Sequence, residues 1–372
     1  MNTLLGHEVA QLKTRNAYWT AKEITQQPQM WQETAQLVAS IKPRLLVELA
    51  PFLDDPDTQV ILTGAGTSAY IGDAIATHLN THMRQSVRAV STTDLVAAPR
   101  QYLATDKPCL LVSFARSGNS PESVAAVELV TQLVSNSQHL FITCNRDGKL
   151  HQAAQQANNA TSILLPEPTL DQSFAMTSSY SSMMVAALQL FAADDGSVDK
   201  LINAAQSMLA ATEQQNIRAF AQQPFERLVY LGSGCLLGFA KEAALKMLEL
   251  SAGQVMSVSE SPLGFRHGPK SLINSKTVVV CFISSDGYTN LYDQDLVAEL
   301  QRDGAAMTVH SLCPKVLPLE DVWQGLLYML FAQQLSFYKA LNLGISPDNP
   351  CPSGEVNRVV QGVVIHPFGS EV

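Results

Sequence analysis

The chain contains the same strand–turn–helix pattern twice, and this duplication constrains its fold more than any other feature. Residues 60–68 read VILTGAGTS and residues 229–236 read VYLGSGCL, so in each copy an apolar run ends in Gly-x-Gly and continues into a helical pattern. The next strand-like segments, CLLVSF at 109–114 and VVVCFI at 278–283, also correspond. Repetition of one supersecondary unit indicates two related domains within the chain.

Strand-like apolar runs alternate with helical patterns through both copies. Continuous apolar strands between helices are typical of a parallel sheet covered by helices on both faces. We therefore predict an α/β protein with two tandem domains, each a flavodoxin-like three-layer αβα sandwich. The predicted divisions are a helical arm at 1–44, a first domain at 45–200, a second domain at 201–344 and a C-terminal tail at 345–372.

Composition is typical of a globular protein with few charges, since 46% of the residues are hydrophobic and 15% are charged. The net charge of −9 argues against a nucleic-acid partner. An anionic substrate must therefore be held by local dipoles and hydroxyls. We find neither a signal peptide nor an apolar run of transmembrane length, so we expect a cytoplasmic protein with no membrane partner. The six cysteines show no metal-ligand spacing, and we expect neither a metal nor a cofactor.

The loops that follow two strands of the first copy are rich in glycine and hydroxyl groups. Ligands of open parallel sheets bind beyond the carboxyl ends of the strands, and backbone amides at helix N-termini bind phosphate. No Gly-Lys-Ser/Thr of a nucleotide triphosphate loop is present. An N-cap role is the alternative for Ser120, because Pro121 begins the next helix. The predicted phosphate ligands are Gly66, Thr67, Ser68, Ser117, Gly118, Asn119 and Ser120.

A third polar turn, DQSFAMTSSYSS at 171–182, precedes a long helical pattern. Thr177 and Ser178 in this turn are candidates to contact a sugar. The alternative is that their hydroxyls only cap the helix.

The second copy carries charge on the helix that follows its glycine turn. Glu242, Lys246 and Glu249 are spaced i, i+4 and i+7, which places them on one face of a helix. A solvent-exposed charged stripe is the alternative interpretation. The loop SESPLGFRHGPKSL at 259–272 then brings in His267. A carboxylate tuned by a nearby lysine, together with an imidazole, is sufficient for acid–base chemistry on a sugar.

These segments resemble the tandem sugar isomerase (SIS) family. GAGTS and ARSGNS resemble its phosphate loops, and KEAALKMLEL followed by SPLGFRHGP resembles the isomerase half of glucosamine-6-phosphate synthase. The resemblance implies that Glu249 moves a proton between C1 and C2 and that His267 opens the sugar ring. It also implies that Lys246 orients the open chain and that Glu242 supports the site. Arg266 replaces a lysine of the family and joins the predicted substrate-binding residues.

The two ends of the chain indicate which group of the family the sequence resembles most. The arm TAKEITQQPQMW and the tail containing SPDNP and GEVNRVVQGV resemble the AgaS-type group, described as tagatose-6-phosphate ketose/aldose isomerases or galactosamine-6-phosphate deaminase/isomerases. The tail has no lysine, whereas that of the synthase carries one able to form a Schiff base with the sugar. The tandem architecture and the apolar composition indicate a homodimer or higher homo-oligomer, and the resemblance implies that His267 then completes the site of the neighbouring subunit.

The resulting prediction is an enzyme that acts without a metal on a sugar phosphate and converts galactosamine 6-phosphate to tagatose 6-phosphate and ammonia. Three alternatives remain open. They are ketose/aldose isomerisation without deamination, deamination of glucosamine 6-phosphate, and a non-catalytic sugar-phosphate sensor.

Overall fold

The computed structural model describes residues 3–192, 196–314, 319–360 and 362–369 and divides the chain into two compact units. The unit we call the five-stranded unit comprises residues 33–170, 178–194 and 355–372. The four-stranded unit comprises residues 1–32, 171–177 and 195–354. Among the described helices, none combines the length and the apolarity that a membrane crossing requires.

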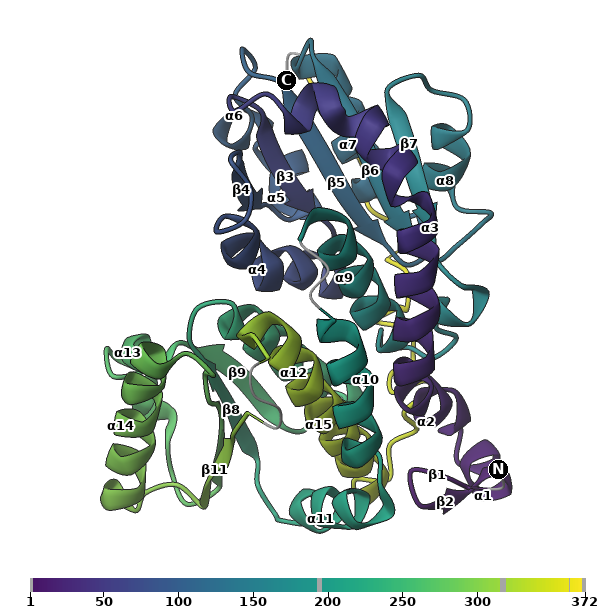
Figure 1. Ribbon diagram of the computed structural model, residues 1–372. Coiled ribbons are helices and arrows are strands. Elements are labelled where there is room, and N and C mark those ends of the chain that lie inside the picture. The colour runs from purple at the N-terminus through teal and green to yellow at the C-terminus, as the bar shows by residue number, and fades with distance from the viewer. Residues whose placement is uncertain (1–2, 193–195, 315–318, 361, 370–372) are drawn as a thin grey trace. The chain divides into compact units, whose positions relative to one another are not determined.

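The five-stranded unit is built on a parallel sheet with the strand order β4-β3-β5-β6-β7 (Figure 1). Counted from its first strand, this order is 2-1-3-4-5, which is the flavodoxin-like order predicted from the sequence. The central strands β3 and β5 are buried along their whole length, as expected for strands covered on both faces. The strands are β3 (Gln59–Thr63), β4 (Ser86–Ala89), β5 (Cys109–Ala115), β6 (Ser137–Thr143) and β7 (Ala160–Leu164).

Helices cover both faces of this sheet (Figure 1). On one face, Leu95 and Val130 of the helices pack against Ile61 and Leu111 of the strands. On the other face, the ammonium group of Lys42 donates to the carbonyl of Gln189 at 2.7 Å and so fixes α3 to the end of α9. The first face carries α5 (Thr92–Ala97), α7 (Pro121–Leu133) and α8 (Lys149–Ala154), and the second carries α4 (Thr67–Leu79), α9 (Ser178–Phe191) and part of α3 (Gln27–Leu53). The short α6 (Pro99–Tyr102) and η1 (Glu167–Thr169) lie in connections.

Helix α3 belongs to both units, since the division falls between residues 32 and 33. The helix also runs without interruption through residues 44 and 45, where the sequence suggested the end of an arm. The predicted arm and first domain therefore share one helix.

The four-stranded unit repeats the same plan with one strand fewer. Its parallel sheet has the order β11-β10-β8-β9. Numbered along the chain and taken from the β9 edge, this order is 2-1-3-4, which matches the first four positions of the other sheet. The two sheets therefore share their topology, as the sequence duplication predicts. The strands are β8 (Arg227–Gly232), β9 (Met256–Glu260), β10 (Thr277–Phe282) and β11 (Thr308–Leu312).

The two faces of the four-stranded sheet carry different helices (Figure 1). Phe265 of α13 packs on the face formed by Val229 and Val279, together with residues of α14. On the opposite face, the ring of Tyr328 from α15 stacks on Phe282. The first face carries α13 (Pro262–Phe265) and α14 (Gly287–Asp303), and the second carries α12 (Leu236–Leu250) and α15 (Asp321–Asn342), with α10 (Ser197–Met208) and α11 (Ala211–Ala221) against α15.

The glycine turns of the two units have the same geometry. Gly66 has a φ of +55° and Gly234 has a φ of +56°, a region that favours glycine. A Cβ on Gly64 would lie 2.6 Å from the backbone of Ser68, and one on Gly232 would lie 2.5 Å from the carbonyl oxygen of Leu236. Each turn therefore needs both of its glycines.

The N-terminal segment of the four-stranded unit is fixed by two carboxylates. Its elements are β1 (Thr3–Leu4), β2 (His7–Glu8), α1 (Val9–Thr14) and α2 (Tyr18–Thr25). Asp348 accepts from the backbone N–H of Thr20 at 2.8 Å and so caps α2. Glu23, buried on α2, accepts from the backbone N–H of Gln172 at 2.5 Å and from the hydroxyl of Ser173. These bonds hold residues 171–177 in this unit.

Burial, and then the charge of Asp171, raise the pKa of Glu23 to about 8. Because the pKa of this carboxyl is higher in the folded state than in the unfolded state, its protonated form stabilises the fold. This stabilisation is complete below pH 4.5 and is lost as the pH rises through 8. The unfolding free energy of the wild type should therefore fall by about 1.4 kcal/mol more than that of Glu23→Gln between pH 7 and 9. Denaturant titrations at both pH values measure this difference, with Glu226→Gln as a surface control. Parallel pH profiles for wild type and Glu23→Gln would contradict the assignment.

Candidate functional site

Two loops of the five-stranded unit lie at the same edge of its sheet. The glycine turn at 64–66 follows β3, and the loop at 116–120 follows β5. These strands are parallel neighbours, so both loops lie at their carboxyl ends. The chain adds β4 on one side of β3 and β5 on the other, which makes this point the topological switch of the sheet. Open α/β sheets bind their ligands at this position.

The switch point presents hydrogen-bond donors. The backbone N–H groups of Gly66, Ser117 and Gly118 donate to no acceptor within the described parts of the chain. Gly118 has a φ of +65°, which turns the loop back on itself. Thr67 and Ser68 begin helix α4 beside these amides. Amides at a helix N-terminus together with hydroxyls form a set of donors suited to an anion.

Asn119 and Ser120 shape the second loop. Ser120 accepts from the backbone N–H of Ser123 at 3.3 Å, so it is the N-cap of α7, the alternative that its position before Pro121 raised. The side chain of Asn119 accepts from the backbone N–H of Lys149 at 3.0 Å. Among Ser117, Asn119 and Ser120, the hydroxyl proton of Ser117 remains for a ligand, together with the free backbone amides of Ser117 and Gly118.

The equivalent loops of the four-stranded unit are filled by carboxylates of the chain itself. Ser233, between the two turn glycines, donates to Asp293 at 2.6 Å, and the backbone N–H of Ser284 donates to the same carboxylate at 2.9 Å. The backbone N–H and hydroxyl of Ser285 donate to Asp321 at 2.6 and 2.8 Å. Internal carboxylates therefore occupy the place that is open in the other unit. Neither aspartate was predicted from the sequence as part of a site.

Helix α12 carries the predicted acid–base residues. Glu242 and Lys246 are fully buried, whereas the side chain of Glu249 is 23% exposed. The ammonium nitrogen of Lys246 lies 3.3 Å from Oε1 of Glu242 and is hydrogen-bonded to Glu249. The alternative interpretation of these residues as a solvent-exposed charged stripe is therefore wrong. Burial lowers the pKa of Lys246, but the two carboxylates outweigh it and raise that pKa overall, so the lysine stays protonated.

His267 lies in a different layer of the same unit. It follows α13, and α13 lies on the face of the sheet opposite to α12 (Figure 1). Its side chain is exposed and makes no hydrogen bond to the described residues, while its backbone N–H donates to Gly264 at 2.9 Å. The predicted acid–base residues thus fall into two groups, one on α12 and one after α13.

The remaining predicted ligands have other surroundings. The guanidinium group of Arg266 forms ion pairs with Glu299 at 2.8 Å and with Asp295 at 3.0 Å, so carboxylates occupy it. Thr177 and Ser178 are fully buried, and the backbone N–H of Thr177 donates to Asp171 at 2.8 Å. Their burial gives neither hydroxyl an open path to solvent.

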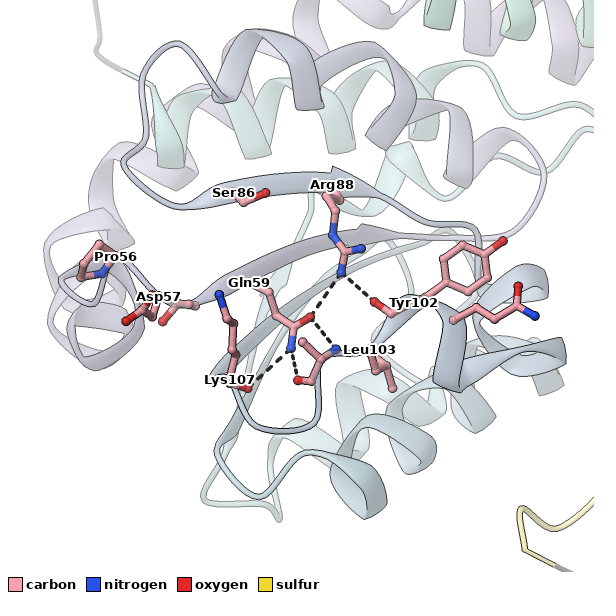
Figure 2. Close-up of a pocket in the computed structure, with 11 residues that line it drawn as sticks. Pro56, Asp57, Gln59, Ser86, Arg88, Tyr102, Leu103 and Lys107 are labelled. Carbon is pink, nitrogen blue, oxygen red and sulfur yellow. Dashed lines mark hydrogen bonds between the residues drawn. The ribbon is translucent and has the colours of Figure 1, made fainter.

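A cavity of about 390 Å³ lies at the amino edge of the five-stranded sheet (Figure 2). Figure 2 shows Arg88 reaching from β4 toward Gln59, the first residue of β3. Arg88 donates to the carbonyl of Tyr102 at 2.6 Å, and the side-chain amide of Gln59 donates to the carbonyl of Ala104 at 2.6 Å. These bonds fix the segment before β5 to the sheet. No predicted site residue lines this cavity, which lies at the edge opposite to the switch point.

Comparison with known proteins shows the family. The chain matches the SIS domain over residues 53–193. It is 50% identical to the D-galactosamine-6-phosphate deaminase AgaS of Shewanella sp. (strain ANA-3), over 99% of this chain and 96% of that protein. It is 45% identical to the D-galactosamine-6-phosphate deaminase AgaS of Escherichia coli, over 94% of this chain and 96% of that protein. The crystal structure of tagatose-6-phosphate ketose/aldose isomerase from Escherichia coli is similar with a TM-score of 0.87 at 42% identity, over 94% of this chain and 97% of that one. The chain therefore belongs to the AgaS family of SIS-domain proteins.

Proposed function

We propose that the protein is a deaminating sugar-phosphate isomerase that converts galactosamine 6-phosphate and water to tagatose 6-phosphate and ammonia. The relatives named as galactosamine-6-phosphate deaminases cover nearly the whole chain. The observation that carries the proposal is the partly exposed Glu249 carboxylate, which is held against the buried ammonium group of Lys246. A carboxylate fixed in this way is suited to proton transfer at a sugar carbon.

The phosphate group of the substrate is assigned to the switch point of the five-stranded unit. Gly66, Ser117 and Gly118 offer free backbone N–H groups there, and Ser117 offers its hydroxyl. The four-stranded unit gives an internal comparison, because its loop donors already bind Asp293 and Asp321. The same fold thus binds carboxylates in one copy and leaves its donors available for a substrate anion in the other.

The reaction follows from acid–base chemistry on the open sugar. His267 opens the ring by moving a proton between the anomeric hydroxyl and the ring oxygen. Glu249 takes the proton from C2 while O1 gains a proton, which gives an enolamine. It then returns the proton to C1 while the amino group loses one, which leaves a hydroxyl at C1 and an imine at C2. Water adds to C2 of the imine and a proton moves to the nitrogen. The C–N bond then breaks, which releases ammonia and leaves the ketone of tagatose 6-phosphate. Lys246 and Glu242 hold Glu249 and the open chain in place, so the acid–base steps rest on residues of the chain itself.

Glu249→Gln removes the proton acceptor while keeping the shape of the side chain. We expect kcat for ammonia release from galactosamine 6-phosphate to fall by roughly 10²–10⁴-fold, with KM nearly unchanged. An assay of ammonia over a range of substrate concentrations measures both constants, with Glu226→Gln as the control. An unchanged kcat in Glu249→Gln would remove this residue from the mechanism.

Three amino-sugar phosphates separate the possible activities. We expect ammonia to be released from galactosamine 6-phosphate faster than from glucosamine 6-phosphate or mannosamine 6-phosphate. Absence of ammonia from all three would reject deamination. Deuterium uptake from solvent at C1 of tagatose 6-phosphate would then identify a plain isomerase, and its absence a non-catalytic binding protein.

Ser117→Ala tests the phosphate site. Loss of one hydrogen bond to a charged group is worth about 1.5–3 kcal/mol, so we expect KM to rise by at least about 10-fold with little change in kcat. Ser285→Ala is the matched control from the other copy, because its hydroxyl is bound to Asp321. Equal KM values for the two variants would contradict the assignment.

We also propose that the active form is a homodimer in which His267 acts in the site of the partner. His267 is exposed, in the layer opposite to α12. Three large apolar side chains on α13 and α14 are exposed as well, namely Leu263, Tyr288 and Leu291 at 49%, 69% and 66%. Tyr288 and Leu291 are spaced i, i+3 on α14 and so are neighbours on its surface, and contiguous exposed apolar side chains are typical of an interface between proteins.

Mixing two inactive variants tests this arrangement. Glu249→Gln retains His267, and His267→Ala retains Glu249, so a mixed dimer would contain one complete site. After unfolding and refolding together in equal amounts, we expect about a quarter of the wild-type activity to return, since half of the dimers are mixed and each has one intact site. Activity no greater than the sum of the separate variants would show that each site is built from one chain.

We place the protein in the cytoplasm. Cys109 and Cys281 are unbridged thiols fully buried in strands β5 and β10. Such thiols are typical of a reducing compartment. The phosphorylated sugar that the protein is proposed to use is a substrate of the same compartment.

A further inference from the structure

The residues on either side of His267 are held by one helix. Arg266 donates from Nε to Glu299 at 2.8 Å and from another guanidinium nitrogen to Asp295 at 3.0 Å. Lys270 forms ion pairs with Glu299 and, at 2.6 Å, with Asp303. The three carboxylates are spaced i, i+4 and i+8 on α14, so they lie along one face of the helix.

The segment between these two basic residues is short and conformationally restricted. It consists of His267, Gly268 and Pro269. Gly268 has a φ of +126°, which side chains rarely tolerate, and the ring of Pro269 fixes its own φ. Phe265, just before the segment, is fully buried in the core of the unit. The exposed imidazole is therefore carried by a backbone that is fixed at both ends.

Glu299 is the central group of this arrangement. One of its oxygens binds Arg266 and the other binds Lys270, so a single carboxylate joins the two ends of the His267 segment. Within the described chain, Asp295 contacts only the first of these ends and Asp303 only the second. Removal of Glu299 would therefore separate the two contacts, whereas removal of an outer aspartate would leave the connection intact.

We propose that Glu299 is a positioning residue that fixes the direction in which His267 is presented to the substrate. This inference rests on the proposed role of His267. Partly exposed ion pairs contribute little to stability, so a network of this size adds little to the fold itself. Catalytic groups, in contrast, must be held close to the productive geometry by their supporting residues, and a displacement of about 1 Å can cost up to ~10²-fold in rate.

Glu299→Gln tests the role, because it keeps the volume of the side chain and removes its charge. We expect kcat to fall by about 10-fold, with KM changed by less than about twofold and the melting temperature by less than about 2 °C. Glu226→Gln is the matched control, since Glu226 pairs with Lys276 on the surface of the same unit. Lys270→Met breaks the same connection from the other side and should reproduce the loss of kcat.

The decisive measurement is a double-mutant cycle with His267→Ala. We expect Glu299→Gln to have no further effect on kcat in the His267→Ala background, because the residue acts through the imidazole. A tenfold loss that persists in that background, or a kcat for Glu299→Gln equal to that of the control, would overturn the proposal. If His267→Ala itself leaves turnover unchanged, the proposed function of His267 fails instead. A KM increase in place of the kcat loss would overturn the positioning role as well.

Discussion

The Gly-x-Gly turn between the first strand and first helix of each unit is the constraint on which the rest of the structure depends. Gly64 and Gly232 have no space for a side chain, and Gly66 and Gly234 have a positive φ. The turn brings the start of the helix close to the end of the strand, so backbone amides gather at the switch point of the sheet. These amides need acceptors. In one unit Asp293 accepts from the backbone N–H of Ser284 and from the hydroxyl of Ser233, whereas in the other the amides of Gly66, Ser117 and Gly118 remain available. The same Gly-x-Gly turn therefore forms a structural contact in one copy and a candidate anion site in the other.

Electrostatics distinguishes the two functional regions as well. The chain has a net charge of −9, so attraction of a sugar phosphate depends on local groups. At the switch point the donors that have no acceptor in the described chain are neutral backbone amides and a hydroxyl. On α12 the groups are charged instead. A buried ammonium group lies between two carboxylates, and their negative charges offset the cost of burying it. Glu249 is the member of this cluster that retains contact with solvent, which is why the proposed proton transfer is assigned to it.

Local patterns in the sequence predicted strands of a parallel sheet and the charged face of α12, because these features depend on residues close together in the chain. Contacts between distant residues could not be predicted in this way. Residues 171–177 join the four-stranded unit because Glu23, about 150 positions earlier, binds Gln172 and Ser173. Arg266 was expected to bind substrate, but its guanidinium group is held by carboxylates that lie about 30 residues later. The helical spacing of those carboxylates was visible in the sequence, whereas their partner was not.

The protonation state of Lys246 bears on how the nitrogen leaves. A lysine forms an imine with a sugar only as the neutral amine, and enzymes that use this route lower the pKa of that lysine. Here Glu242 and Glu249 raise the pKa of Lys246, so its ammonium group has no lone pair with which to attack a carbonyl. The segment at 345–372 contains no lysine at all. These residues favour direct attack of water on an imine formed from the amino group of the substrate. In that scheme the ammonium group of Lys246 stabilises the negative charge that develops on the sugar oxygen, and the carboxylate beside it moves the proton.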